Sequence, residues 1–90
     1  MSHWTAWASA RLACALVERG DVGRAEEVLA DAFAGPVVTS LMARHARARV
    51  LAARGSPDAR PYAEDSRALL EESGYLIGVR ALDELLATMP

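Results

Sequence analysis

Two similar stretches decide the fold: RLACALVERG at Arg11–Gly20 and ARARVLAARG at Ala46–Gly55. Placed over each other at an offset of 35 residues, they share an alanine, a leucine, an arginine and the final glycine. A period in this range is typical of stacked helical pairs, because one pair alone cannot bury its apolar face. The sequence therefore favours an open stack of helical pairs over a closed bundle.

Helix signals extend outward from the first stretch in both directions. Gly20 can supply the left-handed residue that ends a helix, and Asp21 can cap the next one. We expect five helices in one all-α domain, residues 1–90, because no run is long enough for a strand. Their expected ranges are Trp4–Arg19, Val22–Ala34, Val37–Arg54, a fourth that starts within Ser56–Pro61 and ends before Gly74, and Tyr75–Thr88.

The spacing of apolar residues predicts which side of each helix is buried. Short turns predict antiparallel hairpins in which Ala13, Leu16, Ala25 and Leu29 bury one another. The second helix carries its stripe at Ala25, Val28, Leu29, Ala32 and Phe33, and the fourth at Tyr62, Ala63, Ser66, Leu69, Leu70 and Ser73. The expected face of the first helix consists of Trp4, Ala8, Leu12, Ala15, Leu16 and Arg19.

Charge and cysteine content limit the classes of function. All ten basic residues are arginine, twelve carboxylates offset them, and the formal net charge is −2. This balance gives no electrostatic basis for binding nucleic acid or acidic membranes. A single cysteine cannot form an internal disulfide, and no stretch has the roughly 20 apolar residues that span a bilayer. We therefore expect a cytoplasmic, unprocessed protein.

Residues for enzyme chemistry are scattered. Without lysine the chain cannot supply the phosphate-binding loop of the P-loop type. His3, Cys14 and His45 are single and widely spaced, unlike the clustered ligands of a zinc site. Cys14 lies among apolar residues, where a thiol usually behaves as a small hydrophobe, and no orienting acid is evident. The sequence predicts no enzyme activity, no metal and no cofactor.

The repeat unit resembles a tetratricopeptide repeat, of the loose kind found in the helical sensor regions of bacterial LuxR-type and MalT-like transcriptional regulators. The resemblance rests on a small residue, a bulky residue three later, a Gly-Asp turn and small residues on the second helix. These roles fall on Ala13, Leu16, Gly20-Asp21, Ala25 and Ala32, and in the second unit on Ala48, Leu51 and Gly55. The resemblance implies two TPR-like helix-turn-helix repeats of antiparallel helices plus a C-terminal helix.

The same resemblance implies a module that binds a protein or peptide in a concave groove built by the first helix of each pair. Transferring the family's concave positions by register predicts a binding patch of Trp7, Cys14, Met42, His45 and Arg49, with Ala10 beside it. An aromatic ring, a thioether and a cation suit an extended peptide with an acidic or aromatic side chain.

Two features of this region have alternative interpretations. Trp4 and Trp7 either cover an exposed end of the core or grip a ligand. Arg44, Arg47 and Arg54 share one sector of the third helix, where they either pair with the acidic fourth helix or form an anion site.

A second class of function is a self-associating structural domain, or part of a larger regulator array, with no dedicated ligand. Stacked repeats normally need about three units, and this chain has two pairs and one odd helix. The fifth helix carries more apolar residues than one stripe against the fourth helix requires. We therefore expect a homodimer through this helix, with Leu82 and Leu86 at the contact and the N-terminal tryptophans as the alternative contact.

Overall fold

The computed structural model describes residues 3–35 and 37–89, without the side chains of residues 3, 4, 37–39 and 42. This part of the chain contains five helices and no strand, which confirms the all-α class. The helices are α1 (His3–Glu18), α2 (Val22–Ala34), α3 (Val37–Ala53), α4 (Ala59–Ser73) and α5 (Leu76–Thr88). The expected helix ends differ from these bounds by at most one residue, and α4 begins within the predicted interval.

The turn between α1 and α2 closes with the hydrogen bonds that a left-handed glycine allows. Gly20 has φ +84°, and its N–H donates to Val17 O at 3.0 Å. The next N–H, of Asp21, donates to Leu16 O at 2.8 Å, which completes the Schellman arrangement. The Asp21 carboxylate then accepts from the N–H of Arg24 at 3.4 Å and caps α2, as predicted.

The same turn recurs at the end of α3. Gly55, at φ +68°, donates its N–H to Ala52 O at 3.0 Å, and Ser56 donates to Leu51 O at 3.0 Å. Each donor and acceptor lies 35 residues after its counterpart in the first turn. The ends of α1 and α3 therefore share their backbone geometry as well as their sequence.

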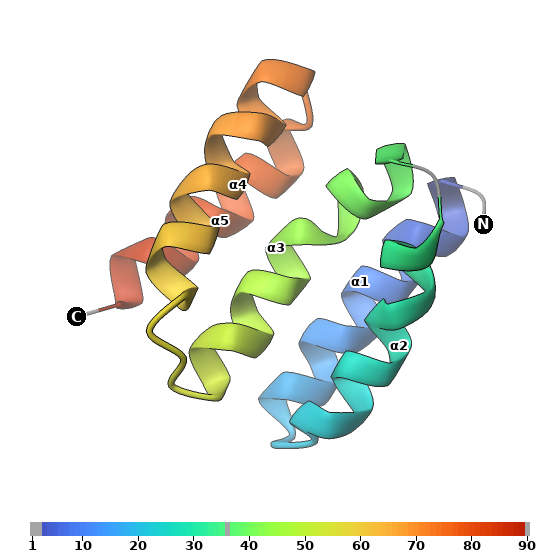
Figure 1. The fold of residues 1–90 in the computed structure, drawn as a ribbon, viewed down its shortest axis with the longest axis vertical. Helices are drawn as coiled ribbons and strands as arrows, with labels where there is room; N and C mark the ends of the chain where they lie inside the picture. Colours follow the sequence, from blue (N-terminus) through green and yellow to red (C-terminus); the bar gives the residue numbers. More distant parts are fainter. Residues whose placement is uncertain (1–2, 36, 90) are drawn as a thin grey trace.

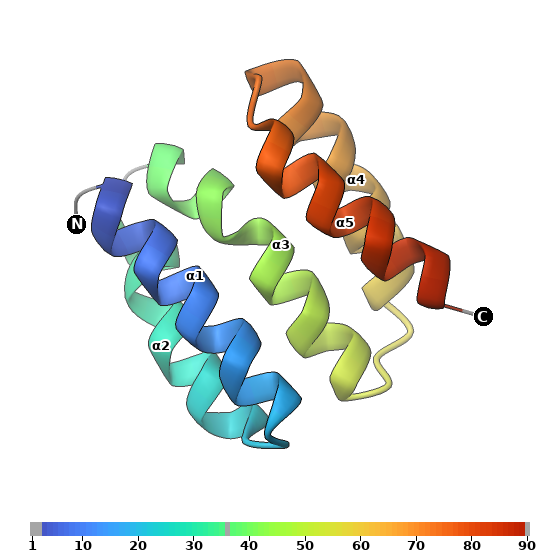
Figure 2. The same cartoon turned by 180° about the vertical axis from the view of Figure 1, so that it is seen from behind.

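Helix α3 occupies the middle of the molecule. It packs against α1 and α2 on one side and against α4 and α5 on the other (Figure 1). In Figure 1 α2 and α4 lie toward the viewer, whereas Figure 2 shows α1 and α5 in front. The molecule measures 34 × 29 × 17 Å, so it is a thin body.

Small side chains line the contacts of α3 with its neighbours. One core cluster joins α1, α2 and α3, and a second joins α3, α4 and α5. Ala13 and Ala25 are fully buried, Leu29 is 4% exposed, and Leu16 packs against them partly buried, in agreement with the predicted hairpin contact. On the other side of α3, Ala48 is fully buried. Alanine at these positions allows the helix backbones to approach closely.

The predicted buried face of α1 is wrong. Leu12 is 51% exposed and Ala8 and Ala15 are exposed, whereas Ala6 and Ala10 are fully buried. The side chain of Trp4, also placed on that face, lies outside the described residues. The physical reason is that alanine occupies several sides of α1, so its hydrophobicity does not select one of them. The side of α1 that is buried is the one that contacts α2 and α3. Leu12 lies on a different side of the helix and is exposed to solvent.

Helices α4 and α5 approach closely at Gly78. A Cβ atom at this position would lie 2.7 Å from Leu70 Cδ1, and Leu70 is fully buried. Only glycine fits this approach without displacing Leu70.

The predicted dimer contact at Leu82 is not available. Leu82 is fully buried in the cluster formed with Leu70 and Val79, and Leu86 packs partly buried against the same cluster. Helix α5 packs on both α4 and α3, so its main apolar stripe is covered within the chain. The large apolar side chains of α5 that are exposed are instead Leu76 and Ile77, at 67% and 71%.

Candidate functional site

Helices α1 and α3 pack against each other, and α1 lies toward the viewer in Figure 2. The ring centroids of Trp7 and His45 are 5.9 Å apart, with an angle of 41° between the ring planes. These two residues, with Cys14 and Arg49, form what we call the α1–α3 surface. The prediction that Trp7 and His45 are neighbours is therefore confirmed.

The polar half of the α1–α3 surface centres on Arg49. Its guanidinium donates to the Glu18 carboxylate across the α1–α3 contact at 3.5 Å. The Cys14 thiol lies near the same guanidinium. Burial raises the pKa of Cys14 above its ordinary value of 9.0, and the Arg49 charge opposes this effect. The thiol is therefore the dominant form of Cys14 near neutral pH, which makes it a poor nucleophile.

The members of the predicted patch differ in accessibility. Trp7 and Cys14 are partly exposed and the side chain of Arg49 is 37% exposed, but His45 is only 7% exposed. The predicted contact residue Met42 lies in α3, with its side chain outside the described residues. His45 therefore positions Trp7 more than it presents a surface of its own. Sequence reasoning missed Glu18, although its position four residues after Cys14 puts it on the same side of α1.

A second group of charged side chains lies on the opposite face of α3. The guanidinium carbon of Arg44 is 4.7 Å from the centroid of the Tyr62 ring, and that of Arg47 is 4.5 Å from the Phe33 centroid. Arg44 Nε also donates to Ser66 Oγ at 2.8 Å. Both guanidiniums therefore rest on aromatic rings from neighbouring helices.

The expected pairing of this arginine sector with acids of α4 is wrong. Arg54 pairs with Glu26 of α2, and the contacts of Arg44 with α4 are to a hydroxyl and a ring. Two of the α4 acids pair within their own helix: Glu64 with Arg60 at 3.5 Å and Glu71 with Arg67 at 2.9 Å. Both are i,i+4 pairs within α4, where the helix itself places the partner within reach.

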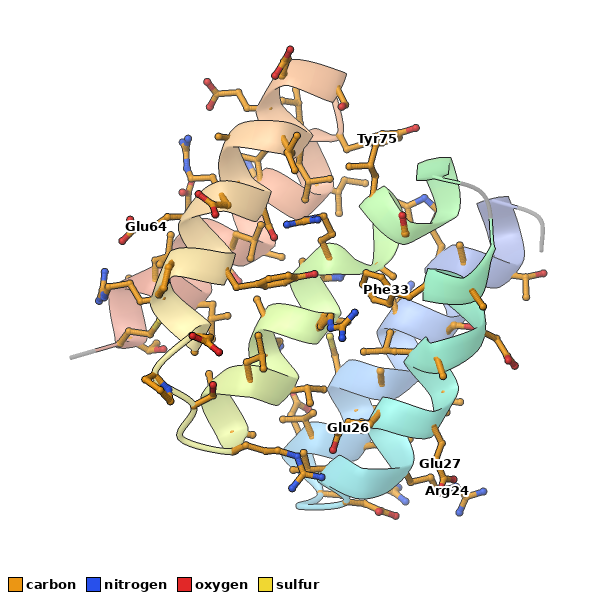
Figure 3. All side chains as sticks on the ribbon, in the orientation of Figure 1. Arg24, Glu26, Glu27, Phe33, Glu64 and Tyr75 are labelled. Carbon is orange, nitrogen blue, oxygen red and sulfur yellow. The ribbon has the colours of Figure 1, made fainter. Side chains whose placement is uncertain are left out.

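A cleft lies between α2 and α3 on this face, and we call it the α2–α3 cleft. Its volume is about 240 Å³. Figure 3 shows Phe33 and Glu26 extending from α2 toward α3, whereas Arg24 and Glu27 lie on the outer side of α2. The cleft is lined by Glu26, Leu29, Ala30, Phe33, Arg47, Val50 and Leu51.

The described ranges, 3–35 and 37–89, contain no group of three or more His, Cys, Asp and Glu residues that could hold a metal ion. No helix in the same ranges combines the length and the apolarity that crossing a bilayer requires.

Comparisons with protein-family models, with curated proteins and with solved structures give no match for this chain.

Proposed function

We propose that the chain is a TPR-like helical repeat module that binds a peptide segment of a protein partner on the α1–α3 surface. The repeat architecture is supported by the matched turns at Gly20 and Gly55, which use the same hydrogen bonds 35 residues apart. It is further supported by α3, which packs on both helices of the preceding pair, and by α5, which packs on both α3 and α4.

The observation that carries the proposal is the contact between Trp7 and His45. A partly exposed indole held against a second ring loses little side-chain freedom when a ligand covers it, so it is a favourable anchor for binding. Arg49 and Glu18 lie on the same surface and can fix the direction of a bound peptide through its charged side chains. The raised pKa of Cys14 fits binding better than covalent catalysis.

Peptide selection from a random library tests this function. We expect selected peptides to bind the unmodified protein and to lose most of their affinity for Trp7→Ala and for Arg49→Glu. Removal of a central aromatic anchor typically costs about 2 kcal/mol or more, which is roughly a 30-fold loss of affinity. Arg24→Glu, on the outer side of α2, is the matched control and should bind as the unmodified protein does.

The selection contradicts the proposal if no peptide binds, or if the selected peptides bind both altered proteins with unchanged affinity. Far-UV circular dichroism of each variant establishes that it is folded.

Self-association is a second candidate, favoured by the exposure of Leu76 and Ile77 on α5. Such a dimer would use these two side chains and not the buried Leu82. Light scattering across micromolar concentrations should then show a dimer that Ile77→Asp dissociates without loss of helicity. A helical monomer throughout that range contradicts this candidate.

A further inference from the structure

Two arginines on the α2 and α4 side of α3 lack an acidic partner. Among the described residues neither Arg44 nor Arg47 forms an ion pair, although their neighbour Arg54 does. Each guanidinium lies over a ring, which stabilises the cation while its N–H groups remain at the edge of the stack. The one hydrogen bond that either of them makes in this part of the chain is from Arg44 Nε to Ser66. Donors for a bound anion therefore remain on both residues.

The hydroxyl of Tyr62 lies in the same place. Its oxygen atom is buried beside the Ser66 side chain, without a hydrogen bond of ordinary geometry to a described residue. Burial raises the pKa of Tyr62 above its ordinary 10.0, while the charges of Arg44 and Arg47 act in the opposite direction. The Arg44 guanidinium lies against this ring, and the Arg47 charge also acts on the hydroxyl. An anion bound against both guanidiniums would meet two cations.

The α2–α3 cleft is lined by Arg47 and by apolar side chains that include Leu29, Phe33 and Val50. Glu26 also lines the cleft, and its carboxylate forms an ion pair with Arg54. Its volume of about 240 Å³ exceeds the roughly 150 Å³ of a cavity that holds benzene. It is smaller than the roughly 300–1,000 Å³ of common small-molecule pockets. The cleft thus has room for one side-chain-sized apolar group.

We propose that this site binds a carboxylate that carries an apolar group of about the size of a leucine side chain. The carboxylate lies against Arg44 and Arg47, and the apolar group enters the α2–α3 cleft. This site is independent of the peptide-binding proposal, because it lies on the other broad face of α3.

N-acetylleucine and N-acetylleucinamide test the proposal, because they differ in the charge of one group. Each is titrated into ¹⁵N-labelled protein, and the amide signals and the arginine Nε–H signals are followed by NMR. We expect N-acetylleucine to shift the signals of Arg44, Arg47 and the cleft residues Ala30 and Leu51. The neutral amide should bind at least about tenfold more weakly, because it lacks the charge-assisted hydrogen bonds.

Arg47→Met keeps an apolar stem and removes the cation. It should weaken N-acetylleucine binding about tenfold or more, whereas Arg24→Met, on the outer side of α2, should leave it unchanged. Equal binding of the acid and the amide overturns the proposal, and so do shifts confined to other parts of the molecule. The comparison of acid and amide uses the unmodified protein, so it remains decisive even if Arg47→Met does not fold.

Two further probes define the source and the chemistry of the ligand. Tighter binding of N-acetyl-Ala-Ala-Leu than of 4-methylpentanoate assigns the site to the carboxyl end of a peptide, and the reverse order assigns it to a free carboxylic acid. Inorganic phosphate tests the apolar part: if it binds as tightly as either acid and shifts the same signals, the assigned ligand chemistry is wrong.

Discussion

Replacing Ala13 by leucine tests the close approach of α1 to its neighbours. Ala13 is fully buried, with Ala25 and Leu29 in the same core cluster. Ala15, two residues later on the same helix, is exposed. Ala13→Leu and Ala15→Leu are therefore the same chemical change in two environments, and their intrinsic helix propensities cancel in the comparison.

The expected difference follows from overpacking. Additional methylene groups in a filled core typically cost about 1–3 kcal/mol, because neighbouring side chains or backbones must move. The same groups on the exposed side of a helix usually change the free energy of unfolding by less than about 0.5 kcal/mol. For a domain of this size, each kcal/mol corresponds to a shift of about 4–8 °C in Tm.

Urea denaturation of both variants, followed by far-UV circular dichroism, measures the difference directly. Ala13→Leu should unfold at a clearly lower urea concentration than Ala15→Leu, with a similar dependence on urea. Equal midpoints for the two variants would refute the close packing of α1 against α2.

Three further results are expected. Gly78→Ala should destabilise the fold in thermal denaturation, because its Cβ would displace the buried Leu70, whereas Gly23→Ala, with no atom within 4 Å of the added carbon, should not. The pKa of Tyr62 is raised from 10.0, so the folded state prefers the neutral phenol; its stabilising effect is present below about pH 10 and is lost as pH rises through the folded pKa. Urea unfolding at pH values on either side of 10 should show this loss, and a Tyr62→Phe variant with the same pH dependence would contradict it. Leu82→Asp should unfold the protein, because the charge would be buried, while Ile77→Asp should retain the full helical circular dichroism signal.

Helix ends could be predicted from the sequence because their signals are local. Gly20, Asp21 and Gly55 act through their own backbone conformation and through groups a few residues away. The contact of Trp7 with His45 was also predictable, because the 35-residue repeat sets the register between α1 and α3.

The exposure of Leu12 on α1 could not be predicted, because it depends on which elements pack beside that helix. Alanine is compatible with both a buried and an exposed position, so the sequence did not exclude a buried Leu12. The same holds for the arginine sector of α3. Its partners are Glu26 and two aromatic rings on other helices, whose distances from α3 depend on how the helices pack.

The α1–α3 surface as a peptide-binding site is the central claim, and NMR of the protein with a selected peptide tests it most directly. The indole N–H of Trp7 and the Nε–H of Arg49 report on this surface, and the amide of Ala30 reports on the opposite face. The account predicts that the first two signals shift on saturation with peptide while that of Ala30 stays in place. Saturable binding that shifts Ala30 and leaves Trp7 and Arg49 unchanged would contradict it.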